Sequence, residues 1–399
     1  MVTGDGAYIK KINRSLLLQK IIENGMISRA ELSKQTGLNK ATVSVQVLDL
    51  LNEKLIIETQ QEHNSIGRRP IILSINGKAG YILGIDLDFP LIQFTVTNIA
   101  GKPVEVHHLH LDTDNYEKVI DILVQHIKQY EEKYSESVYG LINVVIGIHG
   151  TVNNNEMINF VPKFKWHKKK IKEDLLKQLD IDIHIDNNAN LSAFAEKVFV
   201  HHYSNNLLNI ILSSGIGAGI IMDGKLNKGY DGYAGEMGHM IISPNGKSCS
   251  CGNHGCWEKY ASEPAALKEL QILLNKEQLT YSDVRQLLDK KDPVVLEYFK
   301  EFIMYLTIGI NNIINIYNPE IIVLNSDMLK MYPNAIKEIE SNLKSSVSQY
   351  REIVLSKLGN KSCVLGACAM GIKRFFEIKE VYLELPESLI QAKQMEYIY

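Results

Sequence analysis

The stretch that decides the fold runs from Gly235 to Glu258 and reads GEMGHMIISPNGKSCSCGNHGCWE. It holds one imidazole and three thiols close together in the chain. This donor set suits a tetrahedral zinc ion and leaves no coordination position open. Glycines at positions 252 and 255 let the backbone fold back around an ion. The sequence therefore predicts a structural zinc site, with the ligands His239, Cys249, Cys251 and Cys256.

The sequence also allows two other interpretations of the cysteines. His254 lies inside the loop between Cys251 and Cys256 and competes with His239 as the fourth ligand. Alternatively, the three thiols are reduced side chains in a loop without a metal. The chain has five cysteines, and an odd, clustered set favours a metal site over a disulfide framework. Cys363 and Cys368 fall in a helical stretch rich in small residues and are expected to be inert core residues.

Further toward the N-terminus, three short helical patterns follow one another. The first is predicted over 13–24, the second over 29–36 after a Ser-x-x-Glu capping box that begins at Ser28, and the third runs to Leu51 after Asn39. In the third helix the apolar stripe should face a small core. The polar side chains predicted to lie away from that stripe and to read DNA are Lys40, Thr42, Ser44 and Gln46.

A predicted hairpin follows these helices. Apolar runs at 55–57 and 70–75 flank a polar tip that ends in Gly67-Arg68-Arg69-Pro70. Arg68 and Arg69 are expected to grip phosphates or a narrow minor groove. Residues 1–78 carry eleven Lys and Arg against seven Asp and Glu, a net charge of +4, which leaves −7 for the remainder because the whole chain carries −3. We interpret 1–78 as a winged helix-turn-helix DNA-binding domain. The alternative is a module that binds another protein.

From Tyr81 onward the pattern becomes alternating strands and helices. Strands are expected at 81–87, 91–97, 104–111, 141–148 and 181–185, with a helix over 116–134. A similar order restarts at Leu208 and includes a long helix over 293–317 and a strand over 320–324. We expect two α/β lobes, 79–206 and 207–399. The glycine-rich loop at 213–219 is interpreted equally well as a phosphate-binding loop or as a tight hairpin.

Composition excludes several classes of protein. With 45% hydrophobic and 22% charged residues, the chain has the usage of a soluble globular protein. Its apolar runs fall short of the roughly 20 residues that span a bilayer. The first ten residues contain Asp5 and no hydrophobic stretch, so they do not form a secretory signal. A cytoplasmic protein is therefore expected.

Together these motifs resemble the ROK family of repressors, open reading frames and sugar kinases, over about residues 10–375. The signature lies in Gly235-Glu236-Met237-Gly238-His239 and in the cysteine stretch that ends at Glu258. The N-terminal helices and Gly67–Pro70 resemble the branch that represses genes of xylose use. The resemblance implies a duplicated actin-like and hexokinase-like fold, the zinc site and a sugar cleft. The sugar-binding positions that it implies are Asn187, Asn188, Glu236, His239 and Glu258.

The chain departs from the kinases of that family at two places. The catalytic carboxylate position holds Asn188, and an amide cannot take a proton from the attacking hydroxyl. The first phosphate loop of the family, Asp-x-Gly-Gly-Thr, is replaced by residues 86–90, in which Asp88 repels phosphate and Pro90 lacks an N–H donor. Lys163 and His149 also stand at positions where relatives often have Asn and Pro, which bears on the identity of the sugar.

These observations predict a repressor and not an enzyme. It should bind a palindromic operator as a homodimer, because one helix-turn-helix reads only a half-site. A sugar, with D-xylose as the first candidate, should release it from DNA. The rival hypothesis is a ROK sugar kinase with an added DNA-binding head, against which Asn188 and Asp88 argue. A DNA-binding protein without an effector is a third hypothesis, against which Glu236, His239 and Glu258 argue.

Overall fold

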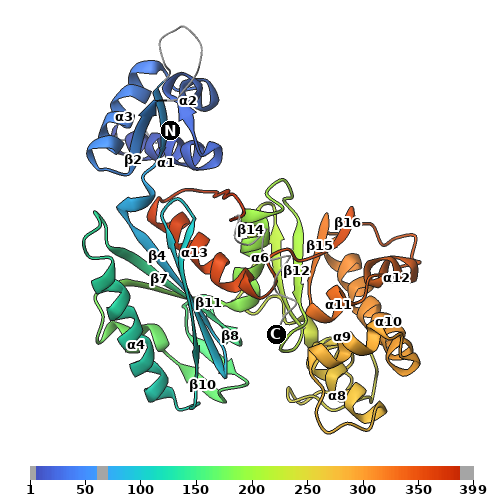
Figure 1. Cartoon of the computed structure of the whole chain (residues 1–399). Helices are drawn as coiled ribbons and strands as arrows, with labels where there is room; N and C mark the ends of the chain where they lie inside the picture. The colour runs from blue at the N-terminus through green and yellow to red at the C-terminus, as the bar shows by residue number, and fades with distance from the viewer. Residues whose placement is uncertain (1–5, 61–70, 387–399) are drawn as a thin grey trace. The chain divides into compact units, whose positions relative to one another are not determined.

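The computed structural model describes residues 6–60 and 71–386 (Figure 1). The chain forms two compact units. The first contains the residues up to Asn187 together with the C-terminal segment that starts at Val364, and the second runs from Asn188 to Cys363. In the described residues, no helix is both long and apolar enough to cross a membrane.

The first unit begins with three helices, α1 (Gly6–Asn24), α2 (Arg29–Thr36) and α3 (Lys40–Asn52). The Ser28 and Asn39 side chains cap α2 and α3 by accepting from the backbone N–H groups of Glu31 and Thr42. Both caps were predicted. The first helix starts earlier than the predicted Asn13. The prediction missed the added turns because their apolar residues are exposed to solvent, so the sequence shows no pattern of buried positions there.

A small antiparallel sheet packs against these helices. It has the order β1-β3-β2, from β1 (Ile27–Ser28), β2 (Ile56–Gln60) and β3 (Ile71–Ile75). β2 and β3 form the predicted hairpin, with Ile56 opposite Ile75. Leu17, Leu50 and Leu73 are fully buried between the helices and the sheet. We call residues 6–60 and 71–75 the head.

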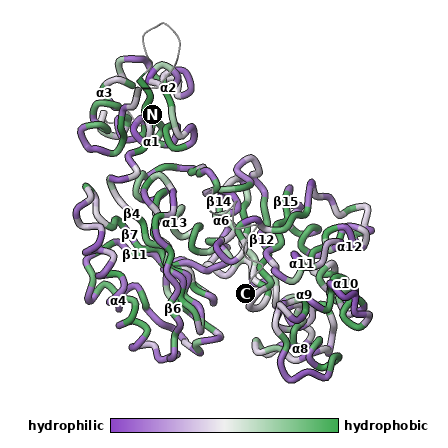
Figure 2. Tube along the Cα trace, in the orientation of Figure 1, coloured by the Kyte–Doolittle hydropathy of each residue, from purple (hydrophilic) through white to green (hydrophobic). Residues whose placement is uncertain are grey.

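The rest of the first unit is a lobe built on a five-stranded mixed sheet of order β11-β7-β4-β5-β6. Strands β4, β5 and β6 form the predicted antiparallel meander, whereas β7 and β11 run parallel to β4. Figure 2 shows that the central strands are hydrophobic along their length. The bounds are β4 (Tyr81–Leu87), β5 (Leu91–Asn98), β6 (Pro103–His110), α4 (Tyr116–Lys133), β7 (Leu141–Ile148), β8 (Thr151–Val152), β9 (Ile158–Val161), β10 (Trp166–Lys169), α5 (Ile171–Leu176) and β11 (Asp182–Asn187).

The second unit repeats this plan. Its sheet has the order β14-β13-β12-β15-β16, again with three antiparallel strands followed by two parallel ones. The predicted duplication is therefore visible in the topology, with β12 in the place of β4. The bounds are α6 (Asn188–Phe199), β12 (Leu207–Ile211), β13 (Gly217–Met222), β14 (Lys225–Leu226), α7 (Glu258–Ala261), α8 (Glu263–Leu273), α9 (Tyr281–Asp289), α10 (Pro293–Tyr317), β15 (Ile321–Asn325), α11 (Asp327–Met331), α12 (Ala335–Asn342) and β16 (Glu352–Leu355). The last helix, α13 (Ser362–Phe375), begins in this unit and belongs to the first unit from Val364 onward.

The glycine-rich loop forms the turn of a hairpin, since β12 and β13 pair antiparallel across it. A Cβ at Gly219 would lie 2.2 Å from the Ala189 carbonyl oxygen on α6. The glycine therefore lets the helix approach the strand closely. Gly217, two residues earlier on the same face, leaves ordinary room, with its nearest neighbour at 3.4 Å.

We expect Gly219→Ala to lower the stability of the second unit by about 1–3 kcal/mol, because an added methyl group forces α6 away from β13. Gly217→Ala is the matched control and should change stability by less than about 1 kcal/mol. Calorimetric unfolding of both variants gives the comparison. Equal effects at the two positions would contradict close helix packing as the reason for Gly219.

Candidate metal centre and sugar-binding residues

The four predicted zinc ligands lie together in the second unit. The ligand atoms of His239, Cys249, Cys251 and Cys256 all lie within 4.8 Å of one another. The Nδ1 atom of His239 is 3.6 Å from the Cys249 sulfur, and the sulfurs of Cys251 and Cys256 are 3.6 Å apart. Tetrahedral zinc with normal bond lengths places its ligand atoms about 3.5–3.8 Å apart. The donor set therefore fits the ion. His254 is exposed and stands outside this group.

The loop geometry that brings these residues together depends on its glycines. Gly255 has a φ of +82°, and a Cβ there would lie 1.7 Å from the Ser243 carbonyl oxygen. Its N–H donates to the Lys247 carbonyl, and the N–H of Cys249 donates to the Asn253 carbonyl. These bonds fold the segment into a tight loop with Cys249 and Cys256 buried.

The crowded thiols also argue for a cation. Burial and the neighbouring thiols of Cys251 and Cys249 raise the pKa of Cys256 to about 12. Burial raises the pKa of Cys249 as well. Three adjacent sulfurs do not ionise together without a positive charge among them, whereas a metal takes them as thiolates and releases their protons. The four side chains could therefore hold a metal ion, and we call His239, Cys249, Cys251 and Cys256 the metal cluster.

Two acidic residues adjoin the metal cluster, Glu236 beside His239 and Glu258 beside Cys249. While its Nδ1 atom faces Cys249, its Nε2 atom lies 3.8 Å from Glu236 Oε2. Glu258 opens α7, and its Oε1 atom lies 3.2 Å from both the Cys249 sulfur and the Lys259 ammonium. Burial raises the pKa of Glu236; His239 opposes this shift and Glu258 adds to it. The side chains of Glu236 and His239 are both partly exposed, so they remain accessible to a small polar ligand.

The two asparagines lie at the boundary between the units. Asn187 ends β11 in the first unit and donates from its amide to the Gly150 carbonyl at 2.7 Å. Asn188 begins α6 in the second unit and is buried. Of the five predicted sugar-binding positions, the second unit contains Asn188, Glu236, His239 and Glu258, and contacts through His239 connect Glu236 to the metal cluster.

Residues 86–90 stand where the family has its first phosphate loop, and the two carboxylates in this segment are paired with basic side chains from elsewhere in the lobe. Asp88 accepts from Lys163 Nζ at 2.6 Å, and His149 Nε2 lies 2.7 Å from Asp86 Oδ1. Burial works against the charged form of His149, but the Asp86 and Asp88 carboxylates outweigh it and raise its pKa. The sequence drew attention to each of these four residues separately. It did not predict that they pair, because the partners are far apart in the chain.

In the head, the predicted DNA-reading residues divide into two groups. Lys40 and Ser44 are exposed and Thr42 is half-buried. The prediction that Gln46 points away from the buried face is wrong: it is 4% exposed, and its amide donates to the Lys10 carbonyl at 3.4 Å. Positions 43, 46, 47 and 50 share one helix face, so Gln46 belongs to the core stripe. Arg68 and Arg69 lie outside the described residues.

Comparison with known proteins places this architecture among sugar-related regulators and kinases. The sequence profile of the ROK family matches residues 82–374. The xylose repressor of Bacillus spizizenii is 38% identical over 95% of this chain and 99% of its own length. The DNA-binding transcriptional dual regulator NagC of Escherichia coli is 24% identical over 93% of this chain and 94% of its own.

Two solved structures illustrate the likeness in fold. A ROK family transcriptional regulator, a homolog of the E. coli MLC protein, superposes with a TM-score of 0.79 at 25% identity, covering 92% of this chain and 96% of its own. A ROK glucokinase from Streptomyces griseus in complex with glucose and AMPPNP has a TM-score of 0.64 at 22% identity, covering 73% of this chain and 99% of its own. The regulator matches far more of the chain than the kinase does.

We predict one zinc ion per chain when the protein is purified under reducing conditions. Cys251→Ser removes one thiolate from the cluster and should lower the zinc content severalfold, as measured by elemental analysis. Cys368→Ser is the control, because that buried thiol lies in the first unit, away from the cluster. A well-folded wild-type protein without metal would contradict the prediction.

Proposed function

The chain belongs to the ROK family, and on that premise we propose that it is a cytoplasmic, sugar-responsive transcriptional repressor. One observation carries the proposal. Relatives named as xylose repressors match 95% of the chain, which includes the head as well as the two α/β lobes. The family profile itself begins only at residue 82, so the likeness to repressors extends over the part that distinguishes them from a lone sugar-binding domain.

The head is proposed as a winged helix-turn-helix. In this assignment α2 and α3 form the helix-turn-helix, around Gly37 with its φ of +70°, and β2 and β3 flank the wing. Exposed Lys40 and Ser44 at the start of α3 support the assignment, because recognition helices present their first turns to the major groove. Two heads in a homodimer would read a palindromic operator. Thr42 on α3, and Arg68 and Arg69 on the wing, are proposed as further DNA contacts.

The proposed effector is a neutral sugar, and D-xylose is the first candidate because of the named relatives. Glu236, His239 and Glu258 offer carboxylate and imidazole groups that suit vicinal hydroxyls, and Asn187 and Asn188 complete the proposed set. The metal would be structural zinc. It would hold the His239 ring by Nδ1 and leave Nε2 for the sugar side of the ring.

We propose that the chain has no sugar kinase activity. Asn188 occupies the position of the catalytic base and has no carboxylate to receive a proton. In the first loop, Asp88 is neutralised by Lys163 and donates nothing to a phosphate. Both features oppose the alternative function, a ROK kinase with an added DNA-binding head.

Glu236→Ala should separate DNA binding from sugar sensing. The variant should bind operator DNA as the wild type does without sugar, yet need roughly tenfold to a hundredfold more D-xylose for release, because a hydrogen bond to a charged group contributes about 1.5–3 kcal/mol. Operator mobility shifts across a sugar titration measure this. Glu297→Gln, an exposed carboxylate on α10, is the control. Normal release of Glu236→Ala would refute the assigned sugar site.

A coupled ATPase assay with D-xylose, D-glucose and N-acetylglucosamine should stay at background for the wild-type protein. The reason is the missing base at position 188. Turnover well above background that disappears in Asn188→Ala would establish the kinase alternative. Turnover that persists in that variant would instead indicate a contaminating enzyme.

The exposed residues at the start of α3 provide a separate test of DNA reading. Ser44→Ala should relax base preference at one operator position by about 1–3 kcal/mol if the hydroxyl contacts a base edge. Lys40→Ala should weaken binding to all sequences alike and make the salt dependence shallower by about one unit. Competition mobility shifts at several salt concentrations distinguish the two effects. Val45→Ala, an exposed apolar change on the same helix, is the control, and three identical profiles would exclude α3 as the reading helix.

A further inference from the structure

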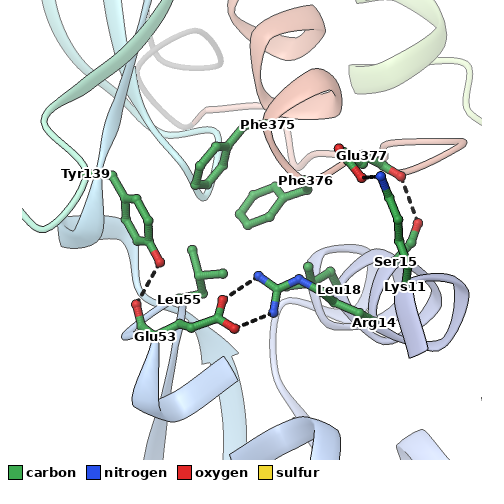
Figure 3. Close-up of a pocket in the computed structure, with 10 residues that line it drawn as sticks. All are labelled: Lys11, Arg14, Ser15, Leu18, Glu53, Leu55, Tyr139, Phe375, Phe376 and Glu377. Carbon is green, nitrogen blue, oxygen red and sulfur yellow. Dashed lines mark hydrogen bonds and ion pairs between the residues drawn. The ribbon is translucent and has the colours of Figure 1, made fainter. Parts of the chain in front are cut away.

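A cavity of about 380 Å³ lies where the head meets the first lobe (Figure 3). On the head side it is lined by residues of α1 and by Glu53 and Leu55, which follow α3. On the lobe side it is lined by Tyr139, which precedes β7, and by Phe375, Phe376 and Glu377 at the end of α13. All of these residues belong to the first unit. We call this cavity and its lining residues the joint.

Within the head, the joint contains a two-pronged ion pair. The guanidinium of Arg14 on α1 donates to both carboxylate oxygens of Glu53, at 2.9 and 2.5 Å. Glu53 is the residue that caps α3. The pair therefore connects α1 to the end of the proposed recognition helix, α3. A displacement of Arg14 or Glu53 is then passed to both helices.

From the lobe, three polar contacts reach the head. The Tyr139 hydroxyl donates to the Glu53 carbonyl at 2.9 Å. Glu377 accepts from the Ser15 hydroxyl at 2.9 Å through its carbonyl, and pairs with Lys11 at 2.5 Å through its carboxylate. Figure 3 shows the Tyr139 and Phe375 rings beside these contacts, with centroids 5.3 Å apart and an interplanar angle of 70°. The lobe thus contacts Glu53 at the end of α3 through Tyr139, and α1 on either side of Arg14 through Glu377.

The helix that ends at the joint begins in the other unit. The boundary between the units falls inside α13, after Cys363. Its first residue, Ser362, donates to the Ser192 hydroxyl and accepts from the Asn325 amide, both in the second unit. Its last turns are held in the first lobe, where the Gly371 carbonyl accepts from Asn143 and Arg374 lies 3.5 Å from Glu156. A continuous helix transmits displacement along its axis.

We propose that the joint sets the orientation of the head on the first lobe, and that α13 is the element through which the sugar signal reaches it. The inference rests on the proposed repressor function. The second unit contains Glu236, His239 and Glu258, and α13 is anchored in that unit at its first residue. A shift of α13 moves Phe375, Phe376 and Glu377, and with them the contacts to Ser15 and Lys11. Arg14 and Glu53 then carry the shift from α1 to the end of α3.

The polar character of the joint suits a switch. Lys11, Arg14, Glu53 and Glu377 each keep between about one third and two thirds of the side chain exposed. Solvated ion pairs of this kind are individually weak, so an effector has only to change a few such contacts. The two cations are matched by two carboxylates within the cavity lining. That balance favours a joint between moving parts over a pocket for a charged ligand.

The test removes lobe-to-head hydrogen bonds without removing packing. The double variant Tyr139→Phe with Ser15→Ala deletes two hydroxyl groups that connect the lobe to the head and keeps the aromatic ring. The control is Tyr134→Phe with Ser135→Ala. Its hydroxyls bond to Glu105 and to the Glu132 carbonyl, both within the lobe, at 2.9 and 2.7 Å. Glu377→Gln, an exposed change that weakens the Lys11 pair, serves as a second joint variant.

The readouts are operator mobility shifts with and without D-xylose, and calorimetric titration of D-xylose. Joint variants should bind D-xylose within about twofold of wild type, whereas the sugar-induced change in operator affinity should fall at least fivefold. Operators whose half-site spacing differs by one base pair should also be bound more equally by the joint variants. The control pair should match the wild type in every measurement.

The outcomes separate this inference from the proposed function. Wild-type protein that binds no operator, or that ignores D-xylose and other sugars, contradicts the proposed function. A responsive wild type whose joint variants respond to the same degree and keep the same spacing preference overturns the joint. Joint variants that lose operator affinity while their D-xylose binding and thermal stability match the control also support the inference, because head orientation then depends on the deleted contacts.

Discussion

The two nitrogens of the His239 ring are the constraint on which the site depends. Nδ1 faces the three sulfurs and Nε2 faces Glu236, so a single ring belongs to both the metal cluster and the acidic cluster. A metal on Nδ1 fixes the ring orientation and its tautomer, and thereby fixes what Nε2 presents to a ligand. The proposed structural role of the metal and the proposed recognition role of the histidine would therefore be one geometric requirement. Because the ring has two nitrogens, the two predictions for this residue do not conflict.

Most of the secondary structure could be predicted from the sequence, because it follows local patterns. The long helix α10 and strand β7 have the predicted ends, since apolar periodicity and a Pro or Gly mark them clearly. Gln46 was misassigned because polarity was taken as a sign of exposure, whereas its position relative to Val43 and Val47 places it in the core. The sequence predicted only that a similar order of strands recurs. That β12 has the same place in its sheet as β4 has in the other became visible in the strand pairing.

The candidate site was predictable where its residues are close in sequence, and not elsewhere. Cys249, Cys251 and Cys256 form a recognisable motif. By contrast, the His149–Asp86 pair and the Tyr139–Glu53 contact of the joint join residues that are 63 and 86 positions apart. No local pattern distinguishes Tyr139 from the other tyrosines of the chain. A long-range polar contact leaves no period in the sequence, and only the fold reveals it.

On the proposed function, the likeness in fold to a ROK glucokinase implies that few residues of such a fold have to change for its chemistry to change. The mixed sheet, the hairpin at Gly219 and the metal loop are parts of the scaffold, and none of them transfers a phosphoryl group. That chemistry needs a base and a cradle for phosphate. In our proposal the amide of Asn188 stands at the position of the base, and Lys163 and His149 pair with the carboxylates of the first loop. On the proposed function, the same scaffold serves to recognise a ligand, and α13, which begins in the second unit and ends in the first, gives that recognition a physical route to the head.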